Sequence, residues 1–217
     1  MKKIVVLLGV FFIHTALFST AQFPDKITYK NTQYKLLTNP LEPFFNEFPE
    51  KHPETEIIST ALWRGYVASF EIINNELFVV DIEIQYKPEA PDNDHDLQWK
   101  SVMDEVFPEQ KRVKADWFSG ILVLPFGDLI KYKHMSYASV YKNYILLEIN
   151  NGSLVKERRL NHKKYEKFKQ KQYEAFQKTK EYQEMKKVLI DEGSTEEFAE
   201  TFLKDLLIEY TRRPRED

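Results

Sequence analysis

Asp81 and Glu83 are the first residues of this chain whose type and spacing could support chemistry. One residue separates them, so both carboxylates project from one face of an expected strand, about 6.5–7 Å apart along the chain. Two carboxylates at such a distance can act as acid and base in glycoside hydrolysis. Trp63, expected on the same side, adds a ring of the kind that stacks on sugars. Alternating acids on the solvated face of a strand are far more common, so catalysis is the minor alternative.

A second acidic pattern, Asp92, Asp94 and Asp96, has the spacing that opens a calcium-binding loop. The rest of that pattern fails, because Leu97 replaces the turning glycine and Met103 replaces the bidentate glutamate. We therefore expect a solvated loop at these residues, and we expect neither a metal nor another cofactor in the protein.

The histidines beyond the first 21 residues have no metal-ligand spacing such as H-x-x-x-H; they are His52, His95, His134 and His162. His134 lies in a tyrosine-rich stretch and is expected to be a surface or hydrogen-bonded histidine, with ligand binding as the alternative. The sequence contains neither the G-x-S-x-G of a nucleophile elbow nor a glycine-rich phosphate loop. No complete catalytic set is visible, so a non-enzymatic protein is favoured.

Arg64 is the basic residue that most needs an explanation, because it precedes a run of apolar residues. We expect it at the rim of the apolar face, near Tyr86. A buried arginine needs an anionic partner, and Asp116 is a candidate. Structural pairing is the first interpretation of Arg64, and ligand clamping is the alternative.

The N-terminal residues 1–21 have the pattern of a secretory signal peptide. Lys2 and Lys3 form a basic start, residues 4–18 form an apolar stretch, and Ala21 provides a small residue before Gln22. The apolar stretch is shorter than the roughly 20 residues that span a bilayer. The sequence therefore predicts cleavage near Ala21-Gln22 and a periplasmic or extracellular mature protein, with a retained N-terminal anchor as the alternative.

Composition limits the remaining possibilities. The chain has no cysteine, which excludes disulfides, thiol nucleophiles and cysteine-ligated metals. Residues 22–150 hold 13 Lys and Arg against 20 Asp and Glu, residues 151–187 hold 12 against 5, and residues 188–217 hold 4 against 9. Such segregation indicates either electrostatic docking of the basic segment or a solvated helix face, and the solvated face is favoured.

Residues 22–158 are expected to form a β-rich domain. The expected hairpins cover residues 27–37, 62–87 and 144–158, the expected short helices cover residues 41–48 and 97–107, and a strand is expected over residues 117–124. Asn151-Gly152 is the strongest turn signal among them. In the middle hairpin, a three-residue loop sorts apolar from charged side chains and pairs Tyr66 with Ile84, Ala68 with Ile82 and Phe70 with Val80.

Residues 159–217 are expected to form a C-terminal helical arm. One long helix is predicted over residues 161–191, and Ser194 with Glu197 forms a capping box for a last helix. The basic, tyrosine-containing first helix could contact an anionic membrane. Interspersed glutamates argue against this and against nucleic acid, so we expect its apolar stripe to pack on the last helix.

Four segments resemble a family of uncharacterised bacterial proteins that are sometimes exported. The motifs that carry the resemblance are NPLE (39–42), WRGYVA (63–68), ADWFSG (115–120) and HMSYASVY (134–141). Ser136 and Ala138 stand where glycines are expected in the last motif. The resemblance implies no activity that can be transferred to this chain.

Together, these observations predict an α+β fold: a mainly antiparallel sheet body with short helices, followed by a C-terminal pair of helices. The favoured function is an exported, non-enzymatic binding protein for a protein or glycan of the cell envelope, with Trp63, Arg64 and His134 as candidate ligand-binding residues. The alternatives are a glycan-acting hydrolase using Asp81 and Glu83 and a peripheral membrane protein that attaches through residues 161–191. Nucleic acid is not an expected partner, and the sequence leaves the oligomeric state open.

Overall fold

The computed structural model describes residues 20–55, 57, 59–89, 97–134 and 136–210, with side chains as far as Lys204. Residues 1–19 lie outside the described residues, and so do Asp92, Asp94 and Asp96. The expectations about export and about the acidic loop therefore stay predictions.

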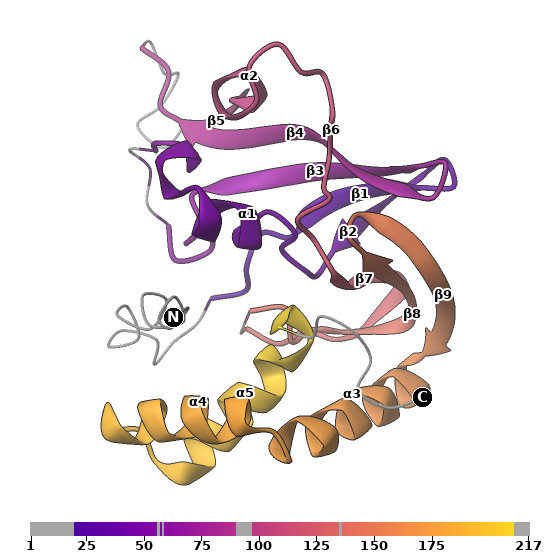
Figure 1. The fold of residues 1–217 in the computed structure, drawn as a ribbon, viewed down its shortest axis with the longest axis vertical. Helices are drawn as coiled ribbons and strands as arrows, with labels where there is room; N and C mark the ends of the chain where they lie inside the picture. The colour runs from indigo at the N-terminus through magenta and orange to yellow at the C-terminus, as the bar shows by residue number, and fades with distance from the viewer. Residues whose placement is uncertain (1–19, 56, 58, 90–96, 135, 211–217) are drawn as a thin grey trace, which may run out of the picture.

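The described chain is an α+β fold with one mixed, mostly antiparallel sheet of nine strands, short helices, and C-terminal helices beneath the sheet (Figure 1). The strands are β1 (Asp25–Tyr29), β2 (Thr32–Leu36), β3 (Tyr66–Ile73), β4 (Glu76–Tyr86), β5 (Gln98–Ser101), β6 (Val113–Lys114), β7 (Gly120–Lys131), β8 (Val140–Asn150) and β9 (Ser153–Asn161). The helices are α1 (Glu42–Glu47), the 3₁₀ turn η2 (Pro49–Lys51), α2 (Met103–Val106), α3 (His162–Gln177), α4 (Lys180–Asp191) and α5 (Glu196–Tyr210). The expected fold class is confirmed.

The strands follow the order β2-β1-β3-β4-β9-β8-β7, and the short strands β5 and β6 both pair with β4. The β1–β3 pair is parallel and the other strand pairs are antiparallel. The N–H of Leu37, directly after β2, donates to the carbonyl of Val123 in β7 at 2.9 Å, so the two ends of the strand order meet. The sheet thus curls around its main core, which α1 and α2 also line.

Two-residue turns close the β1–β2, β3–β4 and β8–β9 hairpins. Their central residues all have positive φ, as type I′ turns require: Lys30-Asn31, Asn74-Asn75 and Asn151-Gly152. The hairpin expected across Asn151-Gly152 is confirmed, and its strands extend further than the sequence predicts.

The β3–β4 hairpin has the expected register at its open end but not near its turn. Tyr66 pairs with Ile84 as expected, whereas Phe70 pairs with Val79 and not with Val80. The two-residue turn shifts the register by one, and a bulge between Ser69 and Phe70 absorbs the shift. The bulge lets buried side chains on both sides of it face the core: Leu77, Val79, Ile82 and Ile84.

Three predicted segments are corrected by the structure. The strand expected from residue 62 begins only at Tyr66, because residues 61–65 form turns that end at Gly65 with φ +77°. The helix expected over residues 97–107 is the strand β5 followed by the short α2, since β5 pairs with the open edge of β4. The strand expected over residues 117–124 is β7, which continues past Pro125 through irregular pairing with β8.

The C-terminal helices bury two apolar clusters. Tyr165 of α3 stacks on Tyr144 of β8 with ring centroids 4.0 Å apart, which attaches α3 to the sheet. The second cluster lies among the three helices and contains Tyr173, Phe176, Tyr182, Leu189, Ala199 and Leu203. The expected packing on the last helix is therefore confirmed for the later part of the apolar stripe, whereas Tyr165 and Phe168 pack on the sheet. The single helix expected over residues 161–191 is instead two helices, because the Thr179 side chain caps the start of α4.

Candidate functional site

Asp81 and Glu83 lie side by side on the outer face of β4, as the sequence predicts, and both are engaged by neighbouring side chains. Asp81 accepts a hydrogen bond from the hydroxyl of Ser101 at 2.6 Å. Glu83 forms a salt bridge with Lys26 at 2.8 Å. These contacts connect β4 to β5 and to β1 across the sheet, which is a structural role for both carboxylates.

His134 is an exposed residue on the loop between β7 and β8. Its Nδ1 lies 3.0 Å from the hydroxyl of Tyr132. This arrangement is the hydrogen-bonded surface histidine that the sequence favours.

Arg64 is almost completely buried, with 3% of its surface exposed, and its partner is Asp25 of β1, whose exposed fraction is 0%. Nη1 of the guanidinium lies 3.2 and 3.1 Å from the two carboxylate oxygens. The expected partner Asp116 is exposed, and the ring over which the guanidinium lies is that of Tyr66, at 5.1 Å from its centroid, where the sequence predicts Tyr86. The correction follows from the parallel pairing of β1 with β3, which the sequence does not reveal.

The ion pair belongs to a larger network of hydrogen bonds. Nη2 of Arg64 donates to the carbonyl of Phe23 and to the hydroxyl of Tyr137, both at 3.1 Å. The Tyr137 hydroxyl donates in turn to Oδ1 of Asn39 at 3.0 Å. The N–H of Ala68 donates to the Asp25 carboxylate at 2.9 Å. We refer to Asp25, Asn39, Arg64 and Tyr137 as the Arg64 network.

Tyr66 and Glu42 continue this polar region toward α1. The hydroxyl of Tyr66 donates to a carboxylate oxygen of Glu42 at 2.7 Å. Burial, followed by the charge of Glu42, raises the pKa of Tyr66 well above its ordinary value. Tyr66 is therefore a neutral hydrogen-bond donor throughout the physiological pH range.

Burial and charge act in opposite directions on the central ion pair. Burial raises the pKa of Asp25, although the Arg64 charge and the Ala68 N–H lower it. Burial lowers the pKa of Arg64, but the Asp25 carboxylate, together with Tyr137 and Tyr66, outweighs that effect, so the pKa lies well above its ordinary value. Because the guanidinium keeps its proton, a buried cation remains that only its internal partners neutralise. Ligand clamping, the alternative role of Arg64, would compete with these contacts.

Three of the four sequence motifs supply residues to the Arg64 network and to its continuation at Tyr66 and Glu42. Asn39 and Glu42 come from the first motif, Arg64 and Tyr66 from the second, and Tyr137 from the fourth. The third motif lies against the first, since the indole of Trp117 donates to the carbonyl of Pro40 at 2.9 Å. Sequence reasoning missed Asp25, which belongs to none of the motifs. The sequence signal for Asp25 is the alternation within DKITY (25–29), which places Asp25 on the same inward face of β1 as Ile27 and Tyr29.

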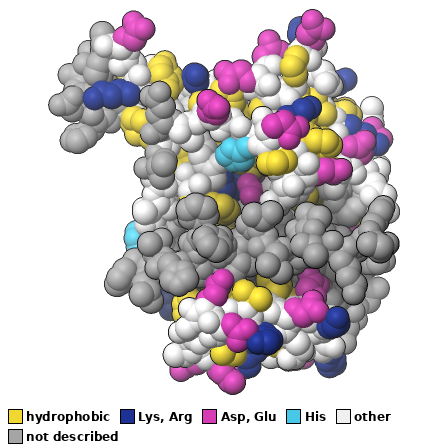
Figure 2. Space-filling view, turned by 60° about the vertical axis from the view of Figure 1, so that its left-hand side comes forward, with side chains coloured by type: hydrophobic (Ala, Val, Ile, Leu, Met, Phe, Trp, Pro, Cys, Tyr) yellow, Lys and Arg dark blue, Asp and Glu magenta, His cyan; other side chains and the backbone are white. Residues whose placement is uncertain are grey.

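Trp63 directly precedes the buried Arg64 but is itself exposed, with 62% of its surface open to solvent. Phe23, Leu97 and Trp99 are further large exposed hydrophobic residues near this end of the sheet. Phe23 contacts Trp99 edge-on with ring centroids 5.8 Å apart, and its N–H donates to the carbonyl of Ala61 at 2.9 Å. We refer to the three aromatic residues of this group, Phe23, Trp63 and Trp99, as the rim aromatics. Figure 2 shows hydrophobic side chains reaching the surface among charged ones over the sheet.

A small hollow among the described residues, partly open to solvent, is too small for an organic ligand. Its volume is about 10 Å³, which is room for about one water molecule. It lies between α3 and strands β7 to β9, away from the Arg64 network, and its lining includes Phe168 and Arg158.

Within the described part of the chain, no three His, Asp or Glu side chains are grouped so that they could hold a metal ion. None of the described helices combines the length and apolar character needed to span a bilayer. No protein-family model matches the chain, and no curated protein or solved structure is significantly similar to it.

Proposed function

We propose that this chain is an exported, non-enzymatic binding protein that contacts a protein or glycan partner of the cell envelope through the rim aromatics. The observation that carries the proposal is the contrast between Trp63, which is 62% exposed, and the adjacent Arg64, which is 3% exposed. Tryptophan is among the residues that contribute most to binding interfaces. The buried ion pair fixes the backbone from which this tryptophan projects, so little entropy is lost when a partner binds it.

The N-terminal segment supports the export part of the proposal. The side-chain amide of Gln22 donates to the carbonyl of Thr60 at 2.7 Å, and its N–H donates to the carbonyl of Ser136 at 3.3 Å. Cleavage after Ala21 would leave Gln22 as the first residue. The mature chain would then begin at a residue that contacts the sheet body, and Phe23 would be placed among the rim aromatics.

Capture from envelope material by residues 22–217 tests the proposal. The parent protein, Trp63→Ala and Val155→Ala are immobilised at equal density and incubated with envelope extract. Val155 of β9 is a matched control, since it is a comparably exposed apolar residue at 56%. Both substitutions are expected to leave the urea midpoint unchanged, because surface changes of this kind alter stability by about 0.5 kcal/mol or less.

The proposal predicts that Trp63→Ala weakens retention at least about tenfold, as loss of a binding hot spot does, whereas Val155→Ala retains the partner like the parent. Protease treatment of the extract distinguishes the partners: loss of retention identifies a protein, and persistence identifies a glycan. Equal retention by the two variants would remove the rim aromatics as the binding surface.

A further inference from the structure

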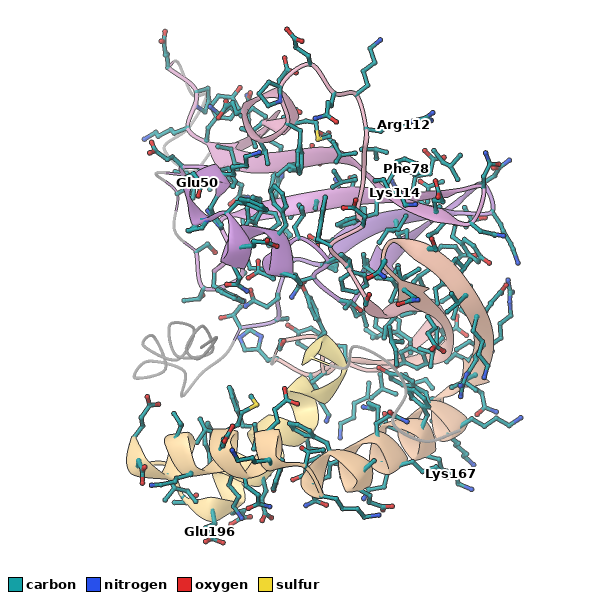
Figure 3. All side chains as sticks on the ribbon, viewed as in Figure 1. Glu50, Phe78, Arg112, Lys114, Lys167 and Glu196 are labelled. Carbon is teal, nitrogen blue, oxygen red and sulfur yellow. The ribbon has the colours of Figure 1, made fainter. Side chains whose placement is uncertain are left out.

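The solvent-facing side of α3 carries an unusual set of cations. Five lysines fall within a sector of about 100° at the helical angle of 100° per residue, on the side opposite the buried residues. They are Lys163, Lys164, Lys167, Lys171 and, at the C-cap, Lys178, and all five are exposed. Glu174 lies in the same sector, where it accepts a hydrogen bond from Gln170. We refer to the five lysines as the α3 lysine stripe. In Figure 3 the labelled Lys167 points away from the strands.

The neighbouring helix α4 shows what an ordinary solvated face looks like in this protein. Lys180 pairs with Glu184 and Lys187 pairs with Asp191, both at the i, i+4 spacing that stabilises helices. Among the described residues, no carboxylate lies within salt-bridge distance of any lysine of the α3 lysine stripe. The stripe is therefore not explained by pairing within its own helix.

The position of the stripe along α3 is a second, independent observation. Lys163 and Lys164 occupy the first turn, which contains no acidic residue. The first turn is the positive end of the helix dipole, where cations are unfavourable and anions are favourable. Lysines at this end reduce the stability of the helix, and a bound anion would offset that cost.

The chemistry of the stripe favours one class of anion. Proteins that bind single-stranded nucleic acids stack the bases on aromatic rings, and amphipathic helices insert apolar side chains into membranes, but the aromatic rings of α3 are used internally. Tyr165, Tyr173 and Phe176 are buried against the sheet and the other helices. A line of lysines without exposed rings fits a flexible polymer with regularly repeated negative groups, bound through charge alone.

We propose that the α3 lysine stripe is a binding surface for an acidic polysaccharide. This surface is separate from the rim aromatics, so it goes beyond the proposed function and does not depend on it. Binding is electrostatic, weakens with salt, and is carried by the unpaired lysines of α3 and not by the paired lysines of α4.

Dextran sulfate is the probe for this surface, and uncharged dextran of the same length is the control polymer. The fluorescence anisotropy of the labelled polymers is measured with residues 22–217 at 50 and 200 mM salt. The proposal predicts binding to dextran sulfate alone, with affinity falling at least about tenfold across this salt range, as counterion release requires. Lys167→Gln/Lys171→Gln is expected to lower the affinity at 50 mM salt at least about fivefold and to reduce the salt slope by about two.

The matched control is Lys180→Gln/Lys187→Gln, which removes the same charge from α4 and is expected to change the affinity less than about twofold. Trp63→Ala should bind dextran sulfate like the parent, which separates this surface from the rim aromatics. Equal losses in the two double variants would show only an effect of net charge and would overturn the proposal. It would also be overturned by absence of binding, or by binding to phosphatidylglycerol vesicles without binding to dextran sulfate.

Discussion

Arg64→Met breaks the buried ion pair while keeping much of the volume of the side chain. The Asp25 carboxylate is left without its guanidinium partner in a site where its exposed fraction is 0%. It keeps the hydrogen bond from the N–H of Ala68 at 2.9 Å. The variant also loses the bonds from Arg64 to Phe23 and Tyr137, so the segment that carries the rim aromatics loses its anchor.

Loss of one partner of a buried ion pair costs about 3–5 kcal/mol, because the remaining charge is uncompensated. With a urea dependence of about 2 kcal/mol/M for a chain of this size, the urea midpoint should fall by about 1.5–2.5 M. Asp25→Asn in the same chain removes the remaining charge and keeps an acceptor for Ala68. The double variant should therefore be more stable than Arg64→Met alone.

Urea unfolding monitored by tryptophan fluorescence measures these midpoints, and hydrogen exchange reports on residues 20–24 and 61–66. Exchange in both segments should become faster in Arg64→Met than in the parent. A loss below about 1 kcal/mol, or a double variant less stable than the single one, would refute the argument that the network is held together by this charge pair.

Four further substitutions test other parts of the fold. Gly152→Ala should lower the free energy of unfolding by about 3 kcal/mol, because φ is +73° and a Cβ would lie 2.9 Å from the backbone oxygen of Ala115. Gly193→Ala should lower it by about 1 kcal/mol, because the space around Gly193 is open. Equal urea midpoints for the two variants would contradict this. A hydrogen bond from Lys30 lowers the pKa of Glu157 to about 2. The ionised Glu157 therefore stabilises the folded protein above about pH 4.5, and this stabilisation is lost as the pH falls toward 2. The free energy of unfolding of Glu157→Gln should thus be about 1 kcal/mol lower than that of the parent at pH 7, after allowance for solvent screening, and equal to it near pH 2. A difference in stability that does not change with pH would argue against this. Glu83→Gln should cost less than about 1 kcal/mol and leave envelope capture unchanged; loss of a glycan-cleaving activity in this variant would instead favour the hydrolase alternative.

Local signals in the sequence predicted the parts of the fold that depend on neighbouring residues. The turn at Asn151-Gly152 and the pairing of Tyr66 with Ile84 follow from turn chemistry and from alternation of apolar residues. The register near Phe70 did not follow, because a two-residue turn combined with a bulge sorts the side chains as well as a longer loop does. The break before α4 depends on the cap at Thr179, which a helical pattern of apolar residues does not reveal.

The candidate site was predicted only in part, because its members are far apart along the chain. The sequence identified Arg64 as a residue that needs an anionic partner. Its actual partner lies 39 residues earlier and reaches it only because β1 pairs in parallel with β3. Tyr137 joins from a loop 73 residues later. Such contacts depend on topology, which neither periodicity nor spacing in one sequence determines.

The most direct test of the central claim, that this is an exported binding protein, is the compartment and intact mass of the native chain. Cells that produce it are fractionated, and the protein is recovered and weighed by mass spectrometry. We predict a chain that begins at Gln22 and is recovered outside the inner membrane. Recovery from the cytosol with Met1 in place would contradict the account.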